Sequence, residues 1–256
     1  MTAQLPVYVI NLPESTARRE SIEQQAERLG FTPRFFEAVD GRAGEHPLFA
    51  RVNQEKRLRL KGRPFKPGEL GVWASHYLLW EKCVRENQVM VILEDDAQLK
   101  PNLIDFLKKG ASIAEQFPYL RLFEGSFASK KLATVEGFHV HRYWRNPLRT
   151  TGYLLAPSAA KAFLSKADEW ILPVDDYMDL PWLHGVDCLG LKPGCILEHT
   201  EFESTIQTRA PKERLTLLHK LRRETFRHYL RARYCLDFGW RMLSSNNKIT
   251  NNINKG

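Results

Sequence analysis

Val89-Met90-Val91-Ile92-Leu93-Glu94-Asp95-Asp96-Ala97 is an apolar run that ends in three consecutive acidic residues. The five apolar residues, rich in β-branched side chains, predict a strand that is covered on both faces. In open α/β sheets, ligands bind where the strands end, so the three carboxylates would lie at the binding edge. Like charges this close repel one another, and a hard divalent cation that brings phosphates with it would neutralise them. A solvated acidic turn is the alternative for the run alone.

Composition limits what the rest of the chain can be. The 256 residues, 43% of them hydrophobic, suffice for one large α/β domain, or for one domain with a helical appendage. Cys83, Cys188, Cys195 and Cys235 show no metal-ligand spacing and are expected to be reduced. No stretch is apolar enough to span a bilayer and no secretory signal is visible, so we expect a cytoplasmic protein. The net charge of +8 favours an anionic partner, such as a nucleotide, a nucleic acid or a lipid headgroup.

Predicted strands and helices alternate along the chain. Strands are predicted at 6–12, 34–39, 89–93, 119–123, 138–143, 150–156 and 195–199, and helices at 13–29, 68–87, 101–116 and 157–164. This order predicts an α/β fold with a mainly parallel central sheet. The segment 42–67 carries many charges and little periodicity, which predicts a long, mobile, basic loop that could close over the site.

Four groups of residues carry a resemblance to a known family. They are Val9-Ile10-Asn11-Leu12 with Arg18-Arg19 and Ala38-Val39-Asp40-Gly41; Gly68-Glu69-Leu70-Gly71 with Ser75-His76 and Trp80; Ile92-Leu93-Glu94-Asp95-Asp96-Ala97; and Gly152-Tyr153 with Pro173-Val174-Asp175. In this order and spacing they resemble glycosyltransferase family 25, which includes bacterial lipooligosaccharide galactosyltransferases. The match spans roughly residues 6 to 200, and its specificity comes from the whole set.

The resemblance implies a GT-A-like nucleotide-binding fold over residues 1–210. It also implies inverting transfer of a sugar, usually galactose, from a UDP-sugar to an acceptor hydroxyl, here of a lipid-linked lipooligosaccharide or lipopolysaccharide saccharide. A metal ion, Mn²⁺ or Mg²⁺, is expected on Asp96 and His199. The nucleotide-sugar pocket is expected to use Asn11, Leu12, Arg18, Asp40, Ser75, His76, Glu94 and Asp95. Within the acidic run, Asp96 is the expected ligand, and its two neighbours would support the ribose and the coordinated water.

An inverting transfer needs a carboxylate that takes the proton of the acceptor hydroxyl. Asp175 matches the acidic position after Pro173-Val174 and is the first candidate for this base. Asp176 and Asp179 are close in sequence and stay open as alternatives. The structural alternative is that one or more of these aspartates caps a helix beginning near Met178.

Residues 211–243 form a basic extension with an apolar face at helical spacing: Leu215, Leu218, Leu221, Phe226, Tyr229 and Leu230, followed by Tyr234, Phe238 and Trp240. A basic amphipathic helix of this kind predicts peripheral contact with an anionic membrane, on the inner face of the cytoplasmic membrane. The alternative is that the apolar face packs on the catalytic domain and the charges are solvated. The tail 244–256, rich in Asn and Lys, is predicted to be disordered.

Two other classes of function remain open from the sequence. A metal-dependent phosphoryl or nucleotidyl transferase could use the same acidic run, although the chain shows no glycine-rich phosphate-binding loop. The positive charge would also suit a nucleic-acid-binding protein, although the basic residues belong to no recognised nucleic-acid module, and no nucleic acid is expected as a partner.

Overall fold

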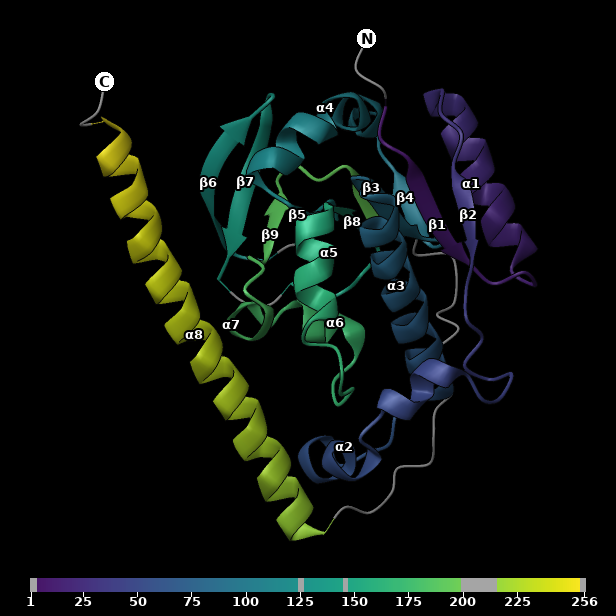
Figure 1. Cartoon of the computed structure of the whole chain (residues 1–256), viewed down its shortest axis with the longest axis vertical. Helices are drawn as coiled ribbons and strands as arrows, with labels where there is room; N and C mark the ends of the chain where they lie inside the picture. Colours follow the sequence, from purple (N-terminus) through teal and green to yellow (C-terminus); the bar gives the residue numbers. More distant parts are fainter. Residues whose placement is uncertain (1–3, 124–126, 145–146, 199–215, 254–256) are drawn as a thin grey trace.

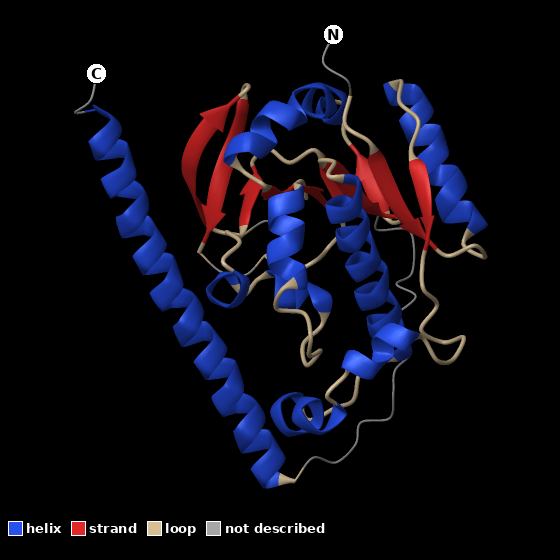
Figure 2. Ribbon diagram, viewed as in Figure 1, coloured by secondary structure: helices blue, strands red, loops and turns tan. Residues whose placement is uncertain are grey.

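The computed structural model describes residues 4–123, 127–144, 147–198 and 216–253. Within these residues, an eight-stranded sheet forms the centre of the protein, in the order β2-β1-β3-β8-β5-β9-β7-β6 (Figures 1 and 2). Its strands are β1 (Val7–Asn11), β2 (Arg34–Glu37), β3 (Met90–Glu94), β5 (Tyr119–Arg121), β6 (Ser129–Val135), β7 (Phe138–Tyr143), β8 (Gly152–Leu155) and β9 (Leu189–Leu191). A small antiparallel sheet pairs β4 (Ala97–Leu99) with β10 (Ile196–Glu198).

Strand direction confirms the α/β class and refines the predicted mainly parallel sheet. β2, β1 and β3 are parallel, and β5 is parallel to β9. β8 is antiparallel to both of its neighbours, and so is β7. Six of the eight strands therefore point the same way, and the two reversed strands, β8 and β7, interrupt the parallel ladder. Sequence could not show this, because a short buried strand has the same apolar run in either direction.

Helices cover both faces of the large sheet (Figure 2). On one face α3 (Pro67–Glu86) packs beside α5 (Pro157–Leu164) and α6 (Val174–Met178). On the other face lie α1 (Thr16–Leu29) and α4 (Asn102–Gln116). Successive residues of β3 point alternately into the two cores, Ile92 into the α3 side and Val91 into the α4 side. The strand before the acidic run is thus covered on both faces, as its composition predicts.

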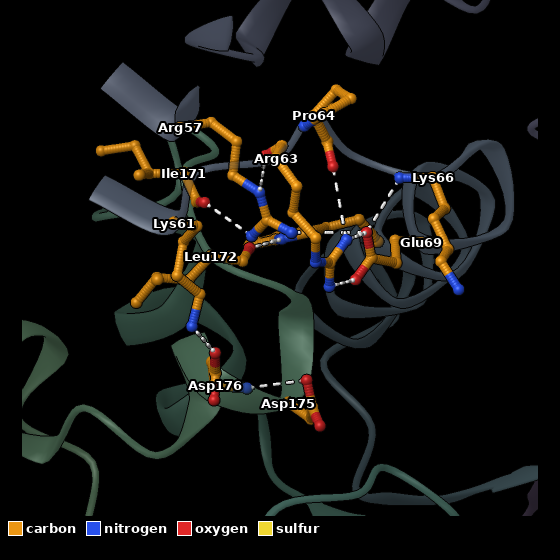
Figure 3. Close-up of polar contacts among 11 residues, drawn as sticks. Arg57, Lys61, Arg63, Pro64, Lys66, Glu69, Ile171, Leu172, Asp175 and Asp176 are labelled. Carbon is orange, nitrogen blue, oxygen red and sulfur yellow. Dashed lines mark hydrogen bonds and ion pairs between the residues drawn. The ribbon is translucent and has the colours of Figure 1, made fainter. Parts of the chain in front are cut away.

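The basic segment 42–67 contains two helices where the sequence predicts a long loop. These are the short 3₁₀ helix η1 (Pro47–Arg51) and the α-helix α2 (Gln54–Lys61). Ion pairs join the segment to residues 168–176: Arg51 to Asp168, Lys56 to Glu169 and Lys61 to Asp176. Figure 3 shows the buried Arg57 of α2, which donates to the carbonyl oxygen of Ile171 at 3.0 Å. Charged contacts hold α2 in place, so its sequence lacks the apolar periodicity from which a packed helix is predicted.

The last helix, α8 (Leu217–Ile253), runs along one side of the domain, from α2 past α7 (Pro181–His184) (Figure 1). It begins inside the predicted basic extension and continues to Ile253, so helix replaces the disordered tail expected from residue 244 over this stretch. No helix in the described part of the chain has the length and apolarity needed to cross a membrane. All four cysteines are free thiols.

Candidate functional site

A cleft opens at the carboxyl edge of β1 and β3. The pairing of these parallel strands places Ile10 opposite Glu94, so the end of β1 lies beside the acidic run. The lining comes from four parts of the chain, within 10–18, 38–42, 68–76 and 94–96. The cleft brings together most of the residues expected in the pocket: Leu12, Arg18, Asp40, Ser75, His76, Glu94, Asp95 and Asp96. The edge at which a ligand was expected is therefore the edge that is open.

Two glycines allow the loop after β2 to pack directly on α3. A Cβ atom on Gly41 would overlap the carbonyl oxygen of Pro67, and one on Gly71 would overlap that of Val39. Ser75 secures the same contact, because its Oγ accepts from the amide of Val39 at 2.9 Å and donates to the carbonyl of Gly71 at 2.8 Å. The buried Ser75 hydroxyl thus holds one wall of the cleft in place.

Asp95 links the acidic run to the first strand and helix. Its carboxylate accepts a hydrogen bond from Asn11 Nδ2 at 2.8 Å and forms an ion pair with Arg18 Nη1 at 2.9 Å. Asn11 ends β1 and is buried, whereas Arg18 lies in the first turn of α1 and lines the cleft. Arg18 places a positive charge and a helix N-terminus beside the carboxylates, an arrangement that favours an anionic ligand.

Glu94 is held by a chain of buried polar groups. Its Oε1 accepts a hydrogen bond from the Thr150 hydroxyl and lies 3.3 Å from His76 Nε2. The other ring nitrogen of His76 is 2.7 Å from the phenol oxygen of Tyr153, which also accepts from Trp80 Nε1 at 3.0 Å. Burial alone would raise the pKa of Glu94, but the hydrogen bonds from His76 and Thr150 outweigh it, and the net shift is downward. Glu94 is therefore a fixed, ionised carboxylate.

The surroundings of Asp96 have the opposite effect and raise the pKa of its carboxyl group. Its Oδ1 is buried and has no hydrogen-bond partner among the residues that the structure describes. Burial raises the pKa of Asp96 to about 7, and the charges of Glu94 and Asp95 add to the rise. A buried carboxylate oxygen without a donor, next to two further carboxylates, suits a hard divalent cation. The donor set therefore fits the metal that the sequence predicts.

The protein would supply only part of such a metal site. Within the described ranges, no three His, Cys, Asp or Glu side chains are grouped to hold a metal ion. His199, the second expected ligand, lies outside the described residues. A cation bound through Asp96 would then share its remaining positions between water and the phosphates of a ligand, as Mg²⁺ commonly does.

The two predicted bases lie on α6, outside the lining of the cleft. Asp175 accepts hydrogen bonds from the amide of Asp176 at 2.9 Å and from that of Arg149 at 3.4 Å. Burial raises the pKa of Asp175, and the neighbouring Asp176 adds to the rise. Arg149 donates to Asp175, and the next residue, Thr150, donates to Glu94, so this dipeptide links Asp175 to the acidic run. Asp176 instead forms an ion pair with Lys61 at 2.8 Å (Figure 3).

Asp179 has a structural role. It is fully buried, forms an ion pair with Arg121 at 2.7 Å and accepts from the amide of Leu148 at 2.9 Å. Leu148 and Arg149 have positive φ angles of 52° and 69°, a conformation that side chains other than glycine rarely adopt. The buried ion pair thus stabilises the strained dipeptide that leads to Thr150. The capping alternative is wrong, because the residue before α6 is Pro173, the residue before α7 is Leu180, and neither helix has a side-chain cap at its start.

Two residues of the site were not singled out from the sequence. Arg42 lines the cleft and bridges two loops, donating to Asp40 at 2.8 Å and to Glu14 at 2.6 Å. Its hydrogen bonds hold the pKa of Asp40 below the usual range. Arg42 could have been predicted from the sequence, because it directly follows Asp40-Gly41. Thr150 was hidden, because only the reversal of β8 brings the start of that strand to this edge.

An α/β sheet with carboxylates and an arginine gathered at its strand ends is typical of proteins that bind phosphorylated ligands. Residues 4–178 match the model of a family described as "Glycosyltransferase family 25 (LPS biosynthesis protein)". The chain belongs to glycosyltransferase family 25, and the resemblance seen in its motifs is confirmed.

Relatives of this chain include much longer proteins and one of similar length. A "Glycosyltransferase 25 family member" of Aedes aegypti is 31% identical over 194 residues, which cover 68% of this chain and 30% of that protein. The "Lipooligosaccharide biosynthesis protein lic2B" of Haemophilus influenzae is 27% identical, with 60% of each chain covered. A "Probable inactive glycosyltransferase 25 family member 3" of Bos taurus is 27% identical over 68% of this chain and 31% of its own length. The chain therefore spans about a third of the animal relatives, and family membership alone does not establish turnover.

One solved structure was also similar. It is titled "Crystal structure of a glycosyltransferase involved in the glycosylation of the major capsid of PBCV-1", with 11% identity and a TM-score of 0.35. It covers 88% of this chain and all of that one.

Proposed function

We propose that this protein transfers a hexosyl group, galactose in the first instance, from a UDP-sugar to a hydroxyl of a lipooligosaccharide or lipopolysaccharide saccharide. The observation that carries the proposal is the buried Oδ1 of Asp96, for which the described part of the chain offers no hydrogen-bond partner. The same cleft also holds Glu94, Asp95 and Arg18. That arrangement suits a diphosphate with a divalent ion, and the family supplies the sugar chemistry. The Haemophilus relative named for lipooligosaccharide biosynthesis supports the class of acceptor.

The residues of the cleft have separable roles in binding the donor. Asp96 would hold Mn²⁺ or Mg²⁺, which supplies neutralisation of the charge that develops on the leaving diphosphate. Arg18, fixed by Asp95, adds a positive charge at the N-terminus of α1. Leu12 and the wall formed by residues 38–41 would enclose the uridine. Glu94, held by His76 and Thr150, stays ionised and would accept a hydrogen bond from the ribose or a bound water.

Inverting transfer requires the acceptor hydroxyl to attack the anomeric carbon opposite the leaving group. The new carbon–oxygen bond forms as the bond to the diphosphate breaks, UDP leaves, and the hydroxyl proton passes to a base. We assign this base to Asp175, whose raised pKa favours taking up a proton. Asp176 is the weaker candidate, since its carboxylate is occupied by Lys61.

A transfer assay tests the proposal. The purified protein would be incubated with Mn²⁺, a panel of UDP-sugars and truncated lipooligosaccharide acceptors, and the products identified by mass spectrometry. We expect UDP and an acceptor that is heavier by one hexose, and a loss of turnover of at least about 100-fold for Asp96→Ala. Asp96→Ala with undiminished turnover would exclude the metal assignment. Release of UMP or of a sugar phosphate would indicate the phosphoryl or nucleotidyl transferase instead.

The base is tested with a matched pair of variants in the same assay. Asp175→Asn is expected to lower kcat by about 100-fold or more with little change in the KM for the donor, whereas Asp176→Asn should retain most of its turnover. The reverse order would move the base to Asp176. Equal, small effects of both variants would remove α6 from the chemistry.

A further inference from the structure

α8 presents two different faces. One face packs on the domain: the hydroxyl of Tyr234 donates to the carbonyl of Tyr143 at 3.0 Å, and the ring of Phe238 lies 4.6 Å from that of Trp144. Arg241 on the same face donates to the carbonyl of Pro181 at 3.0 Å and pairs with Asp187. These contacts explain how the helix is held, and they use only some of its aromatic residues.

The opposite face carries large apolar side chains in solvent. We call it the exposed stripe, and its members are 53% to 74% exposed: Leu218, Leu221, Tyr229, Leu236, Trp240 and Leu243. Their spacings of 3, 8, 7, 4 and 3 residues place them along one side of a helix. The stripe is about 38 Å long at 1.5 Å per residue. Packing on the domain, one of the two alternatives for this helix, therefore leaves its main apolar face uncovered.

Basic side chains border the exposed stripe. Arg222 and Arg233 each lie one turn after a stripe residue, Leu218 and Tyr229, and are exposed. Neither forms an ion pair with any residue in the described ranges. From residue 217 to 243 the helix has seven Lys and Arg against two acidic residues. The guanidinium of Arg233 also lies over the ring of Trp182 on α7, 5.9 Å from its centre, and keeps its charge. An apolar strip with a tyrosine and a tryptophan, bordered by arginines, is complementary to an anionic lipid surface.

We propose that the exposed stripe of α8 lies on an anionic membrane surface, with its leucines and Trp240 in the interface and Arg222 and Arg233 among the lipid headgroups. A second copy of the chain is a poorer occupant, because pairing two stripes would bring their bordering arginines together. The helix lies along the surface and does not cross it, since it lacks a spanning apolar stretch. The inference concerns binding alone and stands whether or not the chain transfers a sugar.

Vesicle flotation of the full chain tests this surface. The probe is vesicles of phosphatidylcholine with 30% phosphatidylglycerol, compared with phosphatidylcholine alone. We expect binding to the anionic vesicles that is at least about tenfold tighter than to neutral ones and that weakens in 0.5 M salt. Absence of binding to the anionic vesicles, or equal binding to both kinds, would overturn the proposal.

Two variants distinguish binding through the exposed stripe from nonspecific hydrophobic binding. Leu236→Glu with Trp240→Glu should weaken binding by at least about tenfold, because both side chains are solvent-exposed and their loss leaves the fold intact. The matched control is Leu197→Glu, a leucine on β10 that is 37% exposed and should bind like the parent chain. Equal loss in stripe variant and control would overturn the proposal. So would sedimentation showing a dimer that the stripe variant abolishes, with no vesicle binding by the parent.

Discussion

Replacing Asp96 with Asn should make the metal-free protein more stable at neutral pH, and the gain should vanish in acid. The pKa of Asp96 is about 7 in the folded chain and 3.8 ordinarily, so the folded state binds this proton more tightly than the unfolded state does. Between these values stability falls as pH rises, and above pH 7 the full penalty applies. A difference of about three in pKa corresponds to about 4 kcal/mol at most, and solvent at the cleft reduces it to about 2–4 kcal/mol.

The assay is urea denaturation with a chelator present, at pH 4, 6 and 8, for parent and variant. The free energy of unfolding of Asp96→Asn should equal that of the parent near pH 4 and exceed it by about 2–4 kcal/mol at pH 8. Asp95→Asn is the matched control, because that carboxylate is satisfied by Asn11 and Arg18 and its loss should destabilise by about 1–3 kcal/mol. A difference for Asp96→Asn that does not change with pH, or a less stable variant at pH 8, refutes the reasoning.

Two further substitutions, each with a control substitution, test the packing around the cleft. Arg121→Met removes the cationic partner of the buried Asp179 and should lower the free energy of unfolding by about 3–5 kcal/mol. Arg19→Met, which breaks an exposed pair, should change it little. Gly41→Ala should destabilise by about 3 kcal/mol or prevent folding, because a Cβ there meets backbone; Gly239→Ala has open space in a helix and should stabilise by about 0.5–1 kcal/mol. Urea denaturation measures all four, and a Gly41→Ala protein as stable as its parent would contradict the close packing.

The place of the site could be predicted from the sequence because it depends on local signals. The apolar run before Glu94 identifies a strand covered on both faces, and a strand end in an α/β sheet identifies the binding edge. Gly30 predicts the end of α1, where it adopts a left-handed conformation with a φ of 75°. These signals need no knowledge of distant parts of the chain.

The separate roles of the three carboxylates in the acidic run could not be predicted from the sequence, since they depend on partners far away along the chain. Asp95 is satisfied by Arg18, 77 residues away, and Glu94 by Thr150, 56 residues away. Only when both are placed does Asp96 emerge as the carboxylate with a buried oxygen, Oδ1, that has no donor among the described residues. Likewise α2 was missed because ion pairs to residues 168–176 stabilise it, and charge pairing leaves no apolar period in the sequence.

The backbone contact between Gly41 and Gly71 has a consequence for changing the donor by protein engineering. At Gly41 and Gly71 the loop after β2 meets α3 backbone to backbone, so this part of the wall cannot adjust its depth through a change of rotamer. Enlarging the cavity for a bulkier sugar nucleotide would instead change side chains of the lining, such as those of Val72 and Arg42. A selection for altered donors should therefore accumulate substitutions at these two positions and leave both glycines unchanged.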